Sequence, residues 1–186
     1  MKKIFSVILI VVCVLFLFSC GEMTRRGIDE FHRGSSDFSL CAWLIPNDFL
    51  EIYDNYVSGD YFFYSNNNYI NNGIDKALMY LVYEEDIYED VKQYVFDNMT
   101  LDIVNKRELN GYVFYENLSF ADSLEYKDID PDSFPYQYNM VAINDEKKTV
   151  LFFGLIAGKS YENIELGNTD FAKYLEVFYG EYYSFE

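Results

Sequence analysis

Apolar and polar positions along the chain form short runs that predict strands separated by a few helices. Runs rich in β-branched and aromatic residues predict strands at 38–45, 61–64, 77–83, 112–116, 138–143 and 149–157. Helical spacing predicts a helix from Asn47 or Asp48 to about Tyr56, another from Asp86 to about Met99, and a last one from Asn168 or Thr169 to Gly180. The order β-α-β-β-α-β-β-β-α predicts an α+β fold, a mainly antiparallel sheet with helices packed on it.

The two clearest patterns are the middle helix and the last strand. The helix beginning at Asp86 has one apolar face, formed by Ile87, Val91, Tyr94 and Val95. Asp86 and Glu89 have the spacing of a capping box at its start. Residues 149–157 are almost continuously apolar, which predicts a central strand covered on both faces. The polar stretch 144–148 is expected to join this strand to the one before it as a hairpin.

The remaining polar stretches predict turns and loops. Residues 58–60 are expected to form a turn, and the asparagine-rich stretch 66–73 a loop, because Asn makes local side-chain turns. The stretch 122–135 is polar and contains two prolines, so we expect a loop there as well. A further turn is expected at Asn110 and Gly111.

The N-terminus has the pattern of an export signal. Lys2 and Lys3 precede fifteen residues, 4–18, of which only Ser6 is polar. This apolar run is short for a membrane span, which needs about 20 residues, and fits the core of a signal peptide. It ends at Leu17-Phe18-Ser19-Cys20, which resembles the lipobox of bacterial lipoproteins.

The resemblance implies a lipid anchor at Cys20. The sulfur of Cys20 would carry acyl chains such as palmitate, and the protein would be anchored in the cell membrane or outer membrane, with its domain exported. An uncleaved signal anchor and ordinary cleavage are the alternatives. The chain then divides into a signal peptide at 1–19, a tether at 20–36 and a single acidic, tyrosine-rich α+β domain at 37–186.

Charge and composition narrow the class of partner. The chain of 186 residues has 14 Lys and Arg against 31 Asp and Glu, a formal net charge of −17. Loss of Lys2 and Lys3 with the signal peptide leaves 12 basic against 31 acidic residues, or −19. Such acidity excludes a nucleic-acid partner, whose phosphates it would repel, and favours a cationic one. The aromatic share of 20% excludes a disordered chain, and the length supports about one domain.

Histidine and cysteine offer little for catalysis. His32 is the only histidine and lies in the expected tether, where no fold would position it for a triad or a zinc site. Cys13 leaves with the signal peptide and Cys20 carries lipid, so Cys41 is the only free thiol. Its apolar neighbours indicate an inert buried residue rather than a nucleophile.

Acidic residues offer two further candidates. Asp128, Asp130 and Asp132 alternate in a loop as calcium ligands can, but Ser133 and Asn139 stand where an EF-hand loop needs Gly and Glu. A solvated acidic loop is the preferred interpretation. Carboxylates that could pair for glycoside hydrolysis are interpreted instead as helix N-terminal charge on a solvated face: Glu84, Glu85, Asp86, Glu89 and Asp90.

The 19 tyrosines are the most unusual feature of the composition. Each buried phenol needs a hydrogen-bond partner, so several are expected to reach the surface, where tyrosine suits recognition. The candidates are Tyr53, Tyr56, Tyr61, Tyr64, Tyr69, Tyr83, Tyr88, Tyr136, Tyr138, Tyr182 and Tyr183.

These patterns predict a lipid-anchored envelope protein with a non-catalytic binding domain. Its expected partners are the membrane, through the anchor, and a cationic protein or a glycan. One alternative is an acidic inhibitor or immunity protein that neutralises a basic toxin or hydrolase. A second alternative is a carboxylate-dependent polysaccharide hydrolase. The sequence predicts no cofactor and no resident metal, with a calcium site at Asp128, Asp130 and Asp132 left open.

Overall fold

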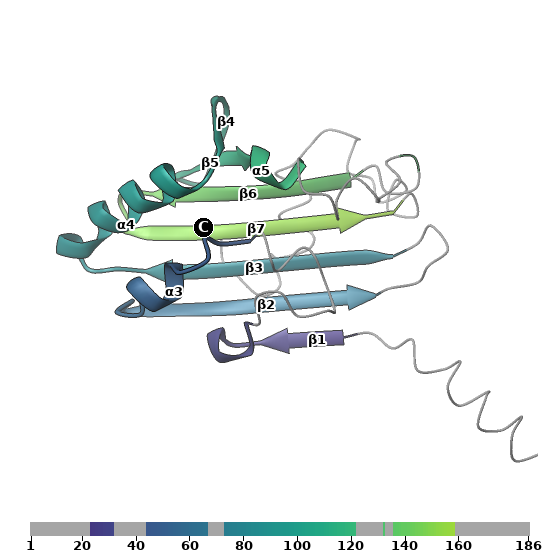
Figure 1. Ribbon diagram of the computed structural model, residues 1–186, viewed down its shortest axis with the longest axis horizontal. Coiled ribbons are helices and arrows are strands. Elements are labelled where there is room, and N and C mark those ends of the chain that lie inside the picture. The colour runs from purple at the N-terminus through teal and green to yellow at the C-terminus, as the bar shows by residue number, and fades with distance from the viewer. Residues whose placement is uncertain (1–22, 32–43, 67–72, 122–131, 133–135, 159–186) are drawn as a thin grey trace, which may run out of the picture.

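One antiparallel sheet of seven strands, in the order β1-β2-β3-β7-β6-β5-β4, forms the body of the protein (Figure 1). The computed structural model describes residues 23–31, 44–66, 73–121, 132 and 136–158. Its strands are β1 (Met23–Arg26), β2 (Ser58–Asn66), β3 (Ile74–Val82), β4 (Leu101–Leu109), β5 (Tyr112–Asn117), β6 (Tyr136–Asn144) and β7 (Thr149–Ala157).

Strand β7 lies at the centre of the sheet. It pairs with β3 from Val82↔Thr149 to Ile74↔Ala157, and with β6 along its whole length. All nine of its residues are buried. The prediction of a central strand covered on both faces is therefore confirmed, and so is the hairpin through 144–148.

The longest helix among the described residues lies where the apolar stripe predicts it. Helix α4 (Glu85–Asn98) buries Tyr88, Val91 and Val95. Glu84 is its N-cap and makes no side-chain cap hydrogen bond, so the predicted capping box at Asp86 is wrong. The N-cap is two residues earlier than expected. Strand β3 ends at Val82, so only Tyr83 and Glu84 lie between the strand and the helix.

The other helices are short. Helix α3 (Phe49–Ile52) is one turn rather than a helix reaching Tyr56, and η1 (Ile28–Glu30) and α5 (Leu118–Ala121) are of similar length. Figure 1 shows α3 and α4 in front of the sheet. The Phe49 ring of α3 meets the Phe152 ring of β7 edge to face, with centroids 5.1 Å apart.

Both faces of the sheet are apolar and buried. On one face, side chains of α3 and α4 share a cluster with Tyr61, Met79, Val141 and Phe152. On the opposite face, a second cluster contains Phe62, Leu78, Phe114, Leu151 and Phe153. Alternate residues of each strand supply the two clusters, as the period of two along a strand requires.

Three parts of the sheet differ from the sequence prediction. Strand β1 lies in the stretch expected to be a solvated tether, and the expected turn at 58–60 is the start of β2. Strand β4 was not predicted, because six of its nine residues are exposed and it lacks the alternation of a half-buried strand. The strand is also irregular at Asp102. The Asp102 carboxylate accepts hydrogen bonds from the backbone N–H groups of Val104 and Asn105, and the register with β5 shifts there.

The mainly antiparallel sheet is thus confirmed, and the described chain is more β-rich than an α+β class suggests. Asn110 and Gly111 form the expected turn, now between β4 and β5, with positive φ angles of 49° and 78°. Three predicted elements lie wholly or mostly outside the described residues: the strand at 38–45, the centre of the loop at 67–72 and the helix from Asn168. Of the predicted strand, Leu44 and Ile45 are described, and they lie in a turn and a bend.

Candidate functional site

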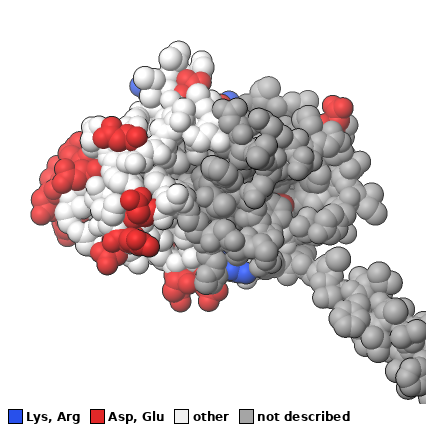
Figure 2. All heavy atoms as spheres, viewed as in Figure 1, with Lys and Arg blue, Asp and Glu red and all other residues white. Residues whose placement is uncertain are grey.

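Acidic side chains gather at the end of the sheet where α4 begins, as Figure 2 shows. Three segments supply them: the end of α3, the start of α4 and the β6–β7 turn. We call this surface the acidic end, and its nine exposed carboxylates are Glu51, Asp54, Glu84, Glu85, Asp86, Glu89, Asp90, Asp145 and Glu146.

Hydrogen bonds from tyrosines hold α3 against this end of the molecule. The Tyr53 hydroxyl donates to the Asp90 carbonyl oxygen at 3.3 Å, and the Tyr83 hydroxyl donates to the Tyr53 carbonyl oxygen at 3.1 Å. Burial raises the pKa of both phenols, and the nearby Asp90 carboxylate adds to the rise in the pKa of Tyr53. Both hydroxyls therefore stay neutral donors at physiological pH.

Two lysines at the acidic end are committed to contacts within the fold. Lys92 Nζ lies 2.6 Å from Asp145 Oδ1 and 3.8 Å from Glu89 Oε2. Lys148 Nζ lies 3.0 Å from Glu85 Oε1. Both ammonium groups also lie over the Tyr88 ring, at 5.8 and 5.2 Å from its centroid. The two cations thus neutralise carboxylates beside Tyr88 and leave those farther out unmatched.

Asp145 is the centre of this arrangement. Its Oδ1 atom accepts hydrogen bonds from Lys92 Nζ and from the Tyr88 hydroxyl, the latter at 2.8 Å. The bond from Lys92, followed by that from Tyr88, holds the pKa of Asp145 below its usual value despite some burial. Burial lowers the pKa of Lys92, but the Asp145 bond and charge raise it above its usual value on balance. Asp145 is therefore ionised throughout the physiological range.

Six carboxylates of the acidic end have no cation within ion-pair distance among the described residues: Glu51, Asp54, Glu84, Asp86, Asp90 and Glu146. All six are exposed, and four of them, Glu84, Asp86, Asp90 and Glu146, come from the two segments that the Tyr88–Asp145 bond joins. Such a surface attracts cations and steers their approach, most strongly at low ionic strength.

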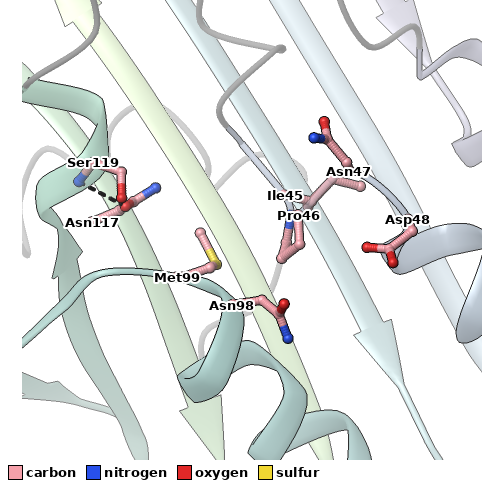
Figure 3. A pocket seen from close by; sticks show the side chains of 8 residues that line it. All are labelled: Ile45, Pro46, Asn47, Asp48, Asn98, Met99, Asn117 and Ser119. Carbon is pink, nitrogen blue, oxygen red and sulfur yellow. Dashed lines mark hydrogen bonds between the residues drawn. The ribbon is translucent and has the colours of Figure 1, made fainter.

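A pocket of about 270 Å³ lies at the other end of α4 (Figure 3). The segment before α3, the C-terminal end of α4 and the junction of β5 with α5 enclose it. Its described lining combines three apolar residues with five polar ones: Ile45, Pro46, Asn47, Asp48, Asn98, Met99, Asn117 and Ser119. Asp48 is the only carboxylate among these, whereas glycoside hydrolysis uses two facing carboxyl groups.

A buried carboxylate lies elsewhere, on β3. Asp75 is only 4% exposed, and its Oδ1 atom has no hydrogen-bond partner within the described part of the chain. Burial raises its pKa to about 7, and a hydrogen bond with Ser65 on the neighbouring strand opposes this rise. Asp75 is not at the acidic end and does not line the pocket, so we treat it as a feature of the fold.

The structure narrows the list of candidate surface tyrosines. Three of the candidates, Tyr61, Tyr83 and Tyr88, are buried, with exposed fractions of 1%, 2% and 0%. Their rings fill the core under α3 and α4, and the hydroxyls of Tyr83 and Tyr88 are satisfied at the edge of that core. Four other candidates are half-buried: Tyr53, Tyr56, Tyr64 and Tyr138. The side chains of the remaining four are not described by the structure: Tyr69, Tyr136, Tyr182 and Tyr183.

Most other predicted site residues also lie outside the described part of the chain. These are Cys20, His32, Cys41, Asp128 and Asp130; Asp132 is exposed in a turn. Among the described residues no three His, Cys, Asp or Glu side chains are grouped as metal ligands. No helix within the described ranges is both long enough and apolar enough to cross a membrane.

The predicted helix N-terminal charge is where the sequence analysis placed it, since Glu84, Glu85, Asp86, Glu89 and Asp90 are all exposed around the start of α4. Sequence reasoning missed the contribution of Asp145 and Glu146, which it treated only as a hairpin connection. It also missed the pocket, because residues 45–48, 98–99 and 117–119 carry no common local pattern.

Comparison with known proteins gives no match: no family model, no curated protein and no solved structure is similar to this chain.

Proposed function

We propose that this protein is a lipid-anchored envelope lipoprotein whose domain is a non-catalytic binding module, and that the acidic end is its recognition surface for a cationic protein. The signal-like segment and Cys20 support the anchor. The finer fold class, an α+β domain with helices packed on its sheet, belongs to the same proposal.

The placement of the lysines is the observation that supports this binding surface. Lys92 and Lys148 are held beside Tyr88. The four outer carboxylates, Glu84, Asp86, Asp90 and Glu146, therefore have no cation within ion-pair distance among the described residues. Unpaired charge of one sign on a folded scaffold favours a partner of the opposite sign and speeds its association.

The short distance from Cys20 to the sheet adds to the proposal. Only Gly21 and Glu22 separate Cys20 from Met23, the first residue of β1. Three residue steps span at most about 11 Å, so an anchor at Cys20 would hold the β1 edge of the sheet close to the lipid headgroups. Arg25 and Arg26, the latter ion-paired with Asp60, would then lie on the strand nearest to the lipid.

The test is binding of an oligolysine peptide to the full chain, purified from membranes in detergent, at low and high salt. One variant neutralises the four outer carboxylates: Glu84→Gln, Asp86→Asn, Asp90→Asn and Glu146→Gln. A matched control neutralises four exposed carboxylates elsewhere: Asp97→Asn, Glu108→Gln, Glu116→Gln and Asp132→Asn.

We expect salt-sensitive binding that weakens roughly tenfold or more in the first variant and about twofold or less in the control. Equal weakening in both variants would show that only the net charge matters, and would contradict a recognition surface at the acidic end. Absence of saturable binding to the unmodified chain would contradict the proposal as a whole.

A second candidate function uses the same surface. An inhibitor or immunity protein that neutralises a basic toxin or hydrolase would need carboxylates gathered on one face rather than spread evenly, and among the described residues nine exposed carboxylates gather at the acidic end. This candidate predicts that the full chain lowers the activity of a basic hydrolase such as egg-white lysozyme, and that the four-carboxylate variant does not.

A further inference from the structure

The pocket lies at the C-terminal end of α4, whereas the four outer carboxylates lie around the start of α4 and in the β6–β7 turn. Helix α4 has 14 residues, and at about 1.5 Å per residue its two ends lie roughly 20 Å apart. Binding in the pocket can therefore be judged independently of the proposed function, and neither depends on the other.

The lining of the pocket selects a class of ligand by its hydrogen-bonding chemistry. Carboxamides of Asn47, Asn98 and Asn117 both donate and accept, as does the Ser119 hydroxyl. No Lys, Arg or His is among the described lining residues, and Asp48 would repel an anion. An apolar ligand would take the exposed amides of Asn47 and Asn98 out of water without offering them hydrogen bonds, which disfavours its binding.

Hydrogen bonds fix the orientation of the polar groups. The Asn98 Nδ2 atom donates to the Tyr94 carbonyl oxygen at 2.9 Å, and the Tyr94 hydroxyl donates to the Asp48 carboxylate. On the opposite wall, the Ser119 backbone N–H donates to Asn117 Oδ1 at 3.2 Å (Figure 3). Side chains held in this way need little further ordering when a ligand binds, which favours affinity.

A buried amide pair extends from this wall into the sheet. Asn117 Nδ2 donates to Asn139 Oδ1 at 3.2 Å, and the two residues are 5% and 2% exposed. The Asn139 Nδ2 atom has no hydrogen-bond partner among the described residues. A buried donor without a partner lowers stability, so two adjacent asparagines in a β-sheet core are more costly than apolar residues of similar size. The pair holds the Asn117 amide in place at the wall of the pocket.

We propose that this pocket binds a neutral polyhydroxylated ligand, a single sugar ring. Hydroxyl groups donate and accept as carboxamides do, and the C–H faces of a sugar ring match the apolar contacts offered by Ile45, Pro46 and Met99. The volume of about 270 Å³ lies just below the range of about 300–1,000 Å³ found for drug-sized ligands, which fits one ring rather than an oligosaccharide.

The test is a titration of the isotope-labelled full chain in detergent with glucose, galactose, mannose and N-acetylglucosamine, followed by NMR of the side-chain amide groups. Sodium acetate, cyclohexanol and N-methylacetamide are the anionic, apolar and peptide-like probes for comparison. We expect saturable binding of at least one sugar with a Kd of roughly 1–10 mM, and shifts of the Asn98 and Asn117 amide resonances.

Variants then separate binding in the pocket from effects on folding. Asn98→Ala and Asn47→Ala alter exposed side chains at the rim, and each should weaken sugar binding roughly tenfold. Gln93→Ala is the matched control, since it removes an exposed amide of α4 that does not line the pocket, and affinity should be unchanged. Asn117→Leu should abolish binding, with folding checked by the unchanged backbone spectrum.

Three results would overturn the proposal. One is the absence of saturable binding by every sugar up to about 100 mM. Another is a stronger response to acetate, cyclohexanol or N-methylacetamide than to any sugar. The third is sugar binding that Gln93→Ala weakens as much as Asn98→Ala does.

Discussion

The hydroxyl of Tyr88 on α4 donates a hydrogen bond of 2.8 Å to the carboxylate of Asp145 in the β6–β7 turn. The Tyr88 ring is fully buried, whereas the Asp145 side chain is 65% exposed. The bond therefore joins the core to the surface, and it ties the start of the long helix to a turn 57 residues further along the chain.

Replacing Tyr88 by Phe removes this bond and keeps the ring. We expect Tyr88→Phe to lower the free energy of unfolding by about 1 kcal/mol, because the ring stays packed and only the hydroxyl contact is lost. The measurement is denaturant unfolding followed by circular dichroism. Tyr56→Phe is the control, since no hydrogen bond of its hydroxyl is found among the described residues, and should change stability by less than about 0.5 kcal/mol.

Replacing Asp145 by Asn should change how stability depends on pH. The pKa of Asp145 in the folded protein lies below its value of 3.8 in an unfolded chain, so the carboxylate stabilises the fold above that pH. This contribution is lost as the pH falls through the folded pKa. Since the side chain is mostly exposed, we expect Asp145→Asn to cost about 0.5 kcal/mol near neutral pH and nothing in strong acid.

The measurement for Asp145→Asn is the free energy of unfolding over the acid range, with Glu146→Gln as the neighbouring control. A stability difference that persists at about pH 2 would contradict the assignment of the effect to ionised Asp145.

The buried Asp75 predicts the opposite pH dependence. Its folded pKa of about 7 lies above the unfolded value of 3.8, so the folded state holds a proton that the unfolded state releases between these values. Stability should fall as the pH rises from about 4 to about 7, by up to roughly 4 kcal/mol. Asp75→Asn should abolish this fall and make the protein more stable than the unmodified chain at about pH 8.

The measurement is the free energy of unfolding at a series of pH values. It compares the unmodified chain with Asp75→Asn and with the exposed control Asp97→Asn. Direct titration of the Asp75 carboxyl by NMR gives the pKa itself. A carboxyl that titrates near 4 would show that Asp75 is better solvated than its 4% exposure implies.

The anchor is tested at Cys20. We expect Cys20→Ala to abolish metabolic labelling with a palmitate analogue and to release the protein from membranes, because the variant offers no sulfur for acylation at the lipobox position. Cys41→Ala is the control and should keep both the label and the membrane fraction. Labelled Cys20→Ala protein would contradict the lipoprotein assignment.

Sequence patterns were sufficient where burial follows a regular pattern along an element. In α4 the residues Val91 and Val95 repeat every turn on the buried face, and β7 is buried at every position, so each pattern predicts its element from the order of residues alone. Strand β4 could not be found this way, because as an edge strand it pairs only with β5 and leaves Ile103 and Val104 64% and 82% exposed.

Sites assembled from distant segments were harder to predict. The acidic residues around α4 were found because five of them are close together in sequence, whereas Asp145 joins them only through the packing of Tyr88. For the pocket, Asp48, Asn98 and Asn117 are brought together by the ends of three elements. No local pattern marks such residues before the sheet order is known.

That sheet order also determines the order in which the fold can form. Strand β3 has β2 on one side, but its other neighbour is β7, whose residues follow it by 67 to 83 positions. The first three strands can pair as the chain emerges, while the free edge of β3 stays open until Ala157 has been synthesised. Pairing at such separation slows folding and leaves an open edge that other chains can pair with. The protein is therefore most prone to aggregation before its central strand is made.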